Sequence, residues 1–192
     1  MSRPRTVAIE LLDWRRRVAD LYAAVRADPD PAHAHDLWRR TRDELFATHP
    51  QSPGPGPLDV PPYDARWRAE VALQPATEQE LGVETGTDGT VVFDRIGVLE
   101  TPWGGLDVWQ LRQYAQGWWV PVKDTSPRSY GGGRYLLDTA KGADLGEVDG
   151  KLVVDLNFLY APSCAHDPRW ACPLAPPGNV LDVPVEAGEL SG

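Results

Sequence analysis

A glycine-rich run followed by an arginine is the part of the sequence best suited to hold a negatively charged ligand. Tyr130-Gly131-Gly132-Gly133-Arg134 contains three glycines, which permit positive φ and let successive backbone amides converge on one anion. The planar guanidinium of Arg134 matches a carboxylate or a phosphate. The run is not a P-loop, because no Lys-Ser or Lys-Thr pair follows it. It predicts an anion cradle or, alternatively, a tight turn whose arginine pairs with an internal acid such as Asp155 or Asp124.

Carboxylate and hydroxyl side chains near this run could transfer protons. Asp124-Thr125-Ser126 directly follows the apolar run 118–122, so a carboxylate lies at the end of a predicted strand, where a general base could act. An Asx turn or a Ser/Thr turn explains the same residues without chemistry. The candidates for catalysis are Asp124, Tyr130 and Tyr160.

Asp155 and Asn157 form a second polar group. They are two residues apart on a predicted strand, so their side chains lie on one face and could point together into a cavity. A structural ion pair between Asp155 and Arg134 is the alternative. The predicted ligand-binding residues are Gly131, Gly132, Gly133, Arg134, Asp155 and Asn157.

Two cysteines with a histidine between them raise the question of a metal. Cys164, His166 and Cys172 could supply three zinc ligands, but their spacing differs from that of familiar zinc modules and no further ligand follows. We therefore predict no metal site and two packed, reduced thiols, because a disulfide is uncommon in the cytoplasm. A catalytic cysteine activated by His166 or Arg169 remains an alternative.

Two helices precede the strands that must carry these residues. Residues 6–26 predict an amphipathic helix, and Asp30-Pro31 is typical of the start of a second helix that runs to about Ala47. Residues 49–62 contain six prolines and predict an extended linker. The expected core face of the first helix consists of Ile9, Leu12, Val18, Leu21, Tyr22 and Val25.

The hydrophobic period changes to two after residue 65. This change predicts strands at 66–73, 91–100, 106–113, 118–123, 133–138 and 152–158, a hairpin turn at Asp88-Gly89, and an edge strand at 180–185. We predict an α+β fold, with two N-terminal amphipathic helices packed on a mainly antiparallel small β-barrel or sandwich and a proline-rich C-terminal wrap. The expected parts are a helical hairpin (1–48), a linker (49–65) and a β-rich body (66–192), forming one structural unit.

Composition narrows the classes of partner. The 192 residues carry a net charge of −9, which disfavours binding to nucleic acid or to anionic membranes. The sequence contains no apolar stretch of about 18 residues and no signal-peptide pattern at its start, so we expect a cytoplasmic protein. Basic residues are mostly arginine, and alanine, proline and glycine are abundant, which suggests a GC-rich bacterial genome.

Four ordered motifs resemble the bacterial domain-of-unknown-function family 1684. They lie at 43–53, 130–136, 155–160 and 164–174, and the segments 176–179 and 187–189 fit as well, so the resemblance extends from about residue 11 to 189. The resemblance implies a location without a reaction. The characteristic positions are Asp124, Tyr130, Gly133, Arg134, Tyr135, Asp155, Asn157, Tyr160, Cys164, Cys172, Pro173 and Asn179.

The chain departs from the family pattern at two places. The family carries a longer Asp-Ala-Thr-x-Gly-x-x-Thr-Tyr stretch where this chain has residues 124–130, so a loop over any pocket is expected to differ. The family usually has an aromatic residue at the position of His166, which argues further against zinc and indicates packing.

Three functions are consistent with these residues. We favour a site for a small anionic metabolite, held by Arg134 and the neighbouring amides. The alternative is a non-catalytic structural or interaction module, in which the polar residues fasten the C-terminal wrap and Arg134 is inaccessible. The third is a flavin-binding split barrel, suggested by short strands, tryptophans and an Arg/Gly site.

Overall fold

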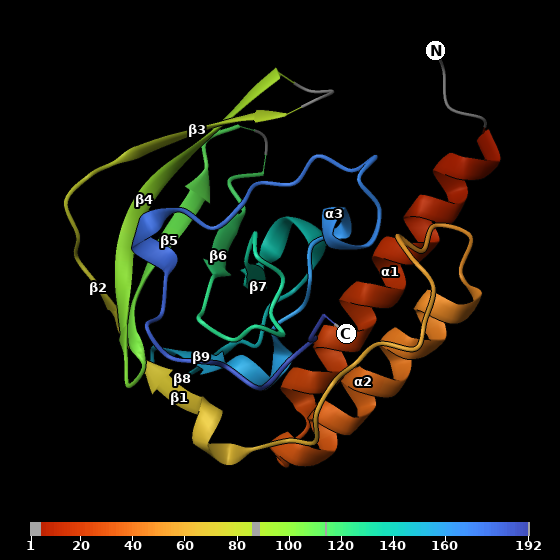
Figure 1. Cartoon of the computed structure of the whole chain (residues 1–192), viewed down its shortest axis with the longest axis horizontal. Helices are drawn as coiled ribbons and strands as arrows, with labels where there is room; N and C mark the ends of the chain where they lie inside the picture. The colour runs from red at the N-terminus through yellow and green to blue at the C-terminus, as the bar shows by residue number, and fades with distance from the viewer. Residues whose placement is uncertain (1–4, 86–88, 114, 192) are drawn as a thin grey trace.

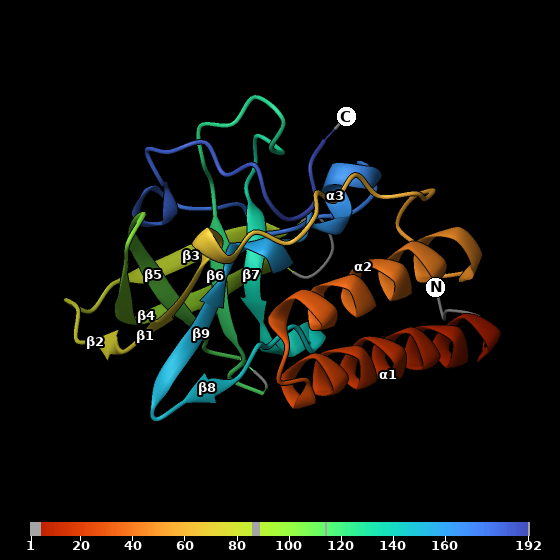
Figure 2. The ribbon, with the colours of Figure 1, turned by 90° about the horizontal axis from the view of Figure 1, so that it is seen from below.

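The computed structural model describes residues 5–85, 89–113 and 115–191. Two long helices lie side by side against a β-rich body, and the C-terminal chain passes over that body (Figure 1). α1 (Arg5–Ala27) and α2 (Pro31–Thr48) confirm both predicted helices and form an antiparallel hairpin (Figure 2). Asp30 begins α2 because its side chain accepts hydrogen bonds from the amides of Ala32 and His33.

The core face of α1 is shorter than the pattern predicted. Val18, Leu21, Tyr22 and Val25 are buried, whereas Ile9 and Leu12 are exposed (58% and 49%). The β-rich body lies against the C-terminal half of α1, which leaves the first turns without a partner on that face (Figure 2). The apolar period of α1 therefore extends beyond the part of the helix that packs on the β-rich body.

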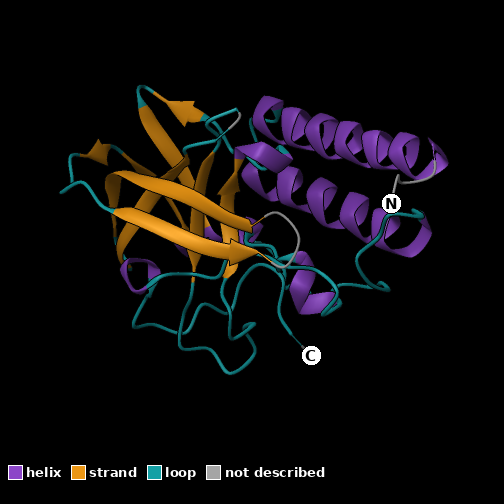
Figure 3. Ribbon diagram, turned by 90° about the horizontal axis from the view of Figure 1, so that it is seen from above, coloured by secondary structure: helices purple, strands orange, loops and turns teal. Residues whose placement is uncertain are grey.

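The described strands form two antiparallel sheets (Figure 3). The larger has the order β2-β4-β5-β6-β7, with β3 also paired to β4, and the smaller has the order β1-β9-β8. The bounds are β1 Arg68–Val71, β2 Leu73–Gln74, β3 Glu80–Thr85, β4 Gly89–Thr101, β5 Gly104–Leu111, β6 Trp118–Val122, β7 Arg134–Asp138, β8 Glu147–Val148 and β9 Lys151–Asp155.

The α+β class is confirmed, but the larger sheet does not close into a barrel. β2 and β3 both pair with β4 at one edge, and β7 at the other edge meets Tyr160 only through an isolated bridge. β4 pairs with two short strands in succession because it is 13 residues long and has a bulge between Arg95 and Gly97. The barrel prediction is therefore wrong, while a sandwich remains a prediction.

Two predicted strands end differently in the structure. The strand expected at 152–158 stops at Asp155, because the Asp155 side chain caps a 3-10 turn, η3 (Leu156–Phe158). Residues 180–185 form no strand and pair with the chain just after β6 through an isolated bridge between Lys123 and Val180. β3 and β8 were not predicted, and the turn proposed at Asp88-Gly89 includes Asp88, which lies outside the described residues.

The C-terminal chain is fastened at several points without forming a sheet. The Asn179 side chain, fully buried, accepts a hydrogen bond from Trp109 Nε1 (2.9 Å) and donates to the carbonyls of Asp107 and Pro121. Farther on, the Leu190 amide donates to the Asp59 carbonyl in the linker (2.8 Å). None of the helices in the described part of the chain has the length and hydropathy needed to cross a membrane.

Candidate functional site

Arg134 is fully buried at the start of β7 and faces the C-terminal chain. Its Nη2 lies 2.8 Å from Asp124 Oδ2, and the side chain of Asp124 is also fully buried. Nη1 donates to the backbone carbonyls of residues 187 and 189, and Nη2 also donates to that of residue 185, at 2.5–3.1 Å, whereas the buried Nε has no hydrogen-bond partner. The structure therefore contains the internal ion pair that was the alternative to an anion cradle, with Asp124 as its acid.

The Asp124 carboxylate, like the Arg134 guanidinium, is hydrogen-bonded to other protein groups. Its Oδ1 accepts hydrogen bonds from the Ser126 amide (2.9 Å), the Ser129 hydroxyl (3.0 Å) and the Val185 amide (3.1 Å). The first of these is an Asx turn, the non-chemical explanation of this segment. A carboxylate with four protein donors and no exposure is poorly placed to take a proton from a ligand.

The glycines form a turn above β7. Gly133 has φ +90°, which favours glycine, and its amide donates to the Tyr130 carbonyl (2.9 Å). A Cβ on Gly132 would lie 2.6 Å from the Tyr130 ring. Gly131 has open space around it. A close approach of the chain and a positive φ thus explain Gly132 and Gly133 without a bound anion, whereas nothing around Gly131 requires glycine.

Asp155 and Asn157 fasten the linker to the body. The Asn157 side chain accepts from the Asp64 amide (3.0 Å) and donates to the Asp64 carbonyl (2.9 Å) and to Asp155 (2.8 Å). The basic neighbour of Asp155 is Arg68, at 3.6 Å, and not Arg134. Burial raises the pKa of Asp155. The two side chains lie together, as predicted, but their partners are protein groups and not a cavity.

We expect the His35 imidazole, which supports this region, to make folding sensitive to acid. His35 is fully buried, and its Nε2 lies 3.0 Å from the Asn157 carbonyl. Burial lowers its pKa below 6.5, so the folded state binds fewer protons than the unfolded state. The free energy of unfolding should therefore fall as the pH drops below about 6.5. Urea denaturation at pH 7.5 and 5.5 measures this loss.

A matched variant isolates His35 from the other histidines. His35→Gln should flatten the dependence of unfolding free energy on pH, without abolishing it because burial also lowers the pKa of His166. His33→Gln, on the same helix where the His33 side chain is 65% exposed, is the comparison and should lower the free energy of unfolding at pH 7.5 less than His35→Gln does. Equal slopes for the wild type and His35→Gln would refute the assignment.

The cysteines lie near Tyr130 but do not form a metal centre. Both are free thiols, and Cys164 Sγ lies 3.7 Å from the Tyr130 hydroxyl. Burial raises the pKa of the Cys172 thiol, which disfavours its use as a nucleophile. The His166 ring packs against Phe46, with ring centroids 5.0 Å apart. Among the described residues, no group of three or more His, Cys, Asp or Glu side chains could hold a metal ion.

Tyr160 is the sequence candidate that borders a pocket. Its ring lies among α1, α2 and the loop after β7, and its hydroxyl donates to Asp138 Oδ2 (3.1 Å). The Lys141 ammonium lies 3.2 Å from the same oxygen. Burial raises the pKa of Tyr160 well above its usual value, so its hydroxyl is a donor at neutral pH. Asp138 therefore holds a tyrosine and a lysine at one point of the pocket wall.

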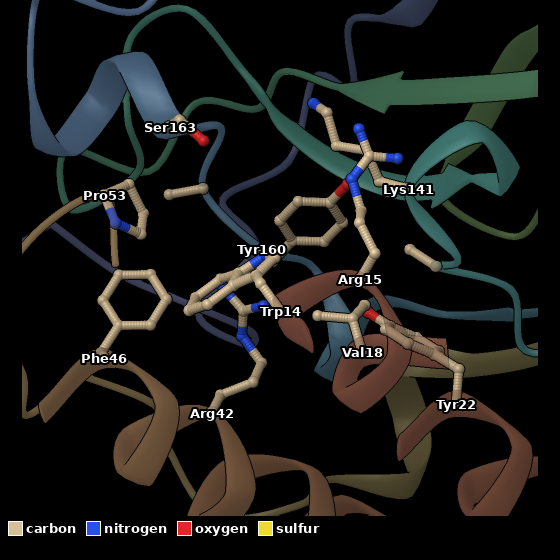
Figure 4. Close-up of a pocket in the computed structure, with 12 residues that line it drawn as sticks. Trp14, Arg15, Val18, Tyr22, Arg42, Phe46, Pro53, Lys141, Tyr160 and Ser163 are labelled. Carbon is tan, nitrogen blue, oxygen red and sulfur yellow. The ribbon is translucent and has the colours of Figure 1, made fainter. Parts of the chain in front are cut away.

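The pocket itself lies between the helical hairpin and the body (Figure 4). Its volume is about 60 Å³, and rings supply much of its lining. Figure 4 shows Arg15 and Lys141 extending to the same side, near the Tyr160 hydroxyl, while Arg42 lies below the ring of Tyr160. The labelled lining residues are Trp14, Arg15, Val18, Tyr22, Arg42, Phe46, Pro53, Lys141, Tyr160 and Ser163.

The three cations of the pocket differ in their partners. Arg42 is buried, lies 2.5 Å from Glu189 Oε1, and stacks within 5.1–5.3 Å of three aromatic rings. Lys141 is paired with Asp138. Arg15 donates to the Ala140 carbonyl (2.8 Å) but pairs with no carboxylate in the described part of the chain. The mouth of this pocket thus has positive charge on a protein whose net charge is −9.

Sequence patterns gave little indication of these residues. Arg15 belongs to an Arg-Arg-Arg run on the polar side of a helix, and Lys141 is one of three lysines, at the end of a 3-10 turn, η2 (Thr139–Lys141). They are 126 residues apart in the chain and meet only because the hairpin packs on η2. The scarcity of lysine was the one signal that could have drawn attention to Lys141.

Comparisons with known proteins assign the chain to a family of unknown function. A family model described as "Protein of unknown function (DUF1684)" matches residues 56–190, so the chain belongs to this family, as the motifs predicted. The chain is also similar to an uncharacterized protein of Haloarcula marismortui solved by solution NMR. The two are 30% identical, the match covers 80% of this chain and 90% of that one, and the TM-score is 0.54. A search of curated proteins found no match.

Proposed function

We propose that the chain binds a small anionic metabolite in the pocket between the helical hairpin and the body. The observation that supports this proposal is that Arg15 and Lys141 converge beside the Tyr160 hydroxyl, at a pocket lined by aromatic rings (Figure 4). Two cations suit a carboxylate or phosphate group, because charge-assisted hydrogen bonds are the strong ones. This keeps the ligand class predicted from sequence and moves the anion from Arg134 to Arg15 and Lys141.

The size of the pocket limits what can enter it. About 60 Å³ accommodates roughly four to six water molecules, which corresponds to one anionic group of a few heavy atoms. The ion pair with Asp138 does not prevent Lys141 from binding an anion, because it uses one donor of the ammonium group and leaves two for a ligand. The ligand group that fits is a single carboxylate or phosphate.

We expect Arg15→Met and Lys141→Met each to weaken anion binding about tenfold or more, since each removes a charge-assisted hydrogen bond. The measurement is a titration with acetate, and separately with inorganic phosphate, followed by ¹H–¹⁵N chemical shifts of residues 139–143 and 160–163. Methionine keeps the length and the apolar stem of both side chains, so loss of charge is the main change.

Arg16→Met is the matched control. Arg16 is the next residue on α1, is exposed, and does not line the pocket. This variant should bind both anions as the wild type does. If neither anion gives saturable shifts in the wild type, or if Arg16→Met loses as much affinity as Arg15→Met, the proposed site is refuted.

The structural-module alternative is favoured for the residues around Arg134. The burial of Arg134 and its contacts to Asp124 and three carbonyls support a role in fastening the C-terminal chain. The two proposals are compatible because they concern different residues. The third hypothesis, a flavin-binding split barrel, gains no support from the open sheet.

A further inference from the structure

A second, apolar cavity shares Lys141 with the proposed anion site. It has a volume of about 160 Å³ and lies on the face of the larger sheet. β3 and β4 contribute Val83, Val91 and Phe93 to its lining, β6 contributes two tryptophans, and Pro173 lines it as well. The charged residues of its lining are Asp138, at the end of β7, and Lys141, in η2.

The walls of this cavity are rings held at fixed angles. The Phe93 and Trp119 rings have centroids 5.0 Å apart, and Trp119 meets Tyr135 edge-on at 5.5 Å. The Lys141 ammonium lies 5.2 Å from the centroid of the Tyr135 ring. A ligand in this cavity would therefore have aromatic faces and edges around its body and one ammonium group at its end.

From these features we infer that the anionic ligand is an aromatic acid, whose ring occupies the apolar cavity and whose carboxylate binds Lys141. This inference rests on the proposed function. An apolar cavity of about 150 Å³ admits one benzene ring, which matches the volume here. Lys141 is the one cation among the residues that line this cavity and suits one carboxylate, whereas the other charged lining residue, Asp138, is an acid and would repel a second carboxylate on the ring.

Three small ligands test the inference on the wild-type chain. Phenylacetate should bind at least about tenfold more tightly than acetate, because its ring is removed from water. Phenylacetamide, which keeps the ring and lacks the charge, should bind at least about tenfold more weakly than phenylacetate. Chemical-shift titration gives the three affinities, and intermolecular NOEs should join the ring protons of phenylacetate to the methyl groups of Val83 and Val91.

A pair of variants on one strand locates the ring. Val91→Phe places extra bulk in the cavity and should remove the advantage of phenylacetate over acetate, while acetate binds as before. Val92→Phe, on the opposite face of β4 and outside the lining, should change neither affinity. Both substitutions suit a strand, since phenylalanine has high β-propensity.

The outcomes separate this inference from the proposed function. If acetate binds through Arg15 and Lys141 but phenylacetate binds no better, the proposed function stands and the aromatic acid is refuted. If phenylacetamide binds as tightly as phenylacetate, the role of Lys141 in the inference is refuted. If neither acid nor inorganic phosphate binds, both proposals fail. The comparison of ligands on the wild type decides the matter even if Val91→Phe does not fold.

Discussion

Arg134→Met should destabilise the protein by about 3–5 kcal/mol, one of the two largest effects that we predict. The substitution leaves Asp124 as a buried charge without its partner and removes the donors of three backbone carbonyls. The melting temperature should fall by roughly 6–20 °C for a chain of this size. Thermal denaturation followed by circular dichroism measures the shift, and urea denaturation gives the free energy.

Arg128→Met is the control for this experiment. Arg128 lies near the same C-terminal chain, but its ion pairs with Asp59 and Glu186 are exposed, so its loss should cost at most about 1 kcal/mol. A double variant that also changes Asp124 to Leu should cost less than the sum of the two single variants, because it leaves no unpaired charge.

The experiment also decides what Arg134 does. If Arg134→Met melts as the wild type does and loses acetate binding, Arg134 is a ligand residue and the cradle predicted from its glycine-rich run is correct. If it is destabilised while the remaining folded protein binds acetate normally, the guanidinium is structural and the anion site lies elsewhere. The buried geometry leads us to expect the second result.

Glu189→Ala is the other substitution with a large expected effect. The Glu189 carboxylate is buried, lies 2.5 Å from two nitrogens of Arg42, and accepts a hydrogen bond from the Ala161 amide (2.8 Å). Its removal leaves the buried Arg42 charge without a partner at the pocket, which should lower the free energy of unfolding by about 3–5 kcal/mol. Because Arg42 and Ala161 both line the pocket, acetate binding should weaken as well.

Glu186→Ala provides the comparison on the same segment. Glu186 is three residues earlier, and its side chain is 40% exposed beside Arg128. We expect a loss of at most about 1 kcal/mol and unchanged acetate binding. Urea denaturation of both variants, followed by an acetate titration of the folded protein, tests the difference. Equal stability of the two variants would contradict the role assigned to the Arg42–Glu189 pair.

The sequence alone determined the elements whose signals are local. Asp30 and Pro31 predicted the start of α2, and alternation predicted most strands, because capping and side-chain period depend on near neighbours. Ordered motifs also identified the family. The same local patterns could not show where 180–185 would lie, since that segment is held by hydrogen bonds with residues 123–125, which follow β6, rather than by a ladder.

Only the tertiary structure decided which polar residues are available to a ligand. The sequence marked Arg134, Asp124, Asp155 and Asn157 as candidate site residues, yet their burial depends on chain segments about 50 to 90 residues away, such as 185–189 against Arg134 and Asp64 against Asn157. Packing of α1 on η2 brought Arg15 beside Lys141, which no local pattern encodes. The residue type specifies which hydrogen bonds and charges a side chain can offer. The fold decides whether protein atoms or a ligand are its partners.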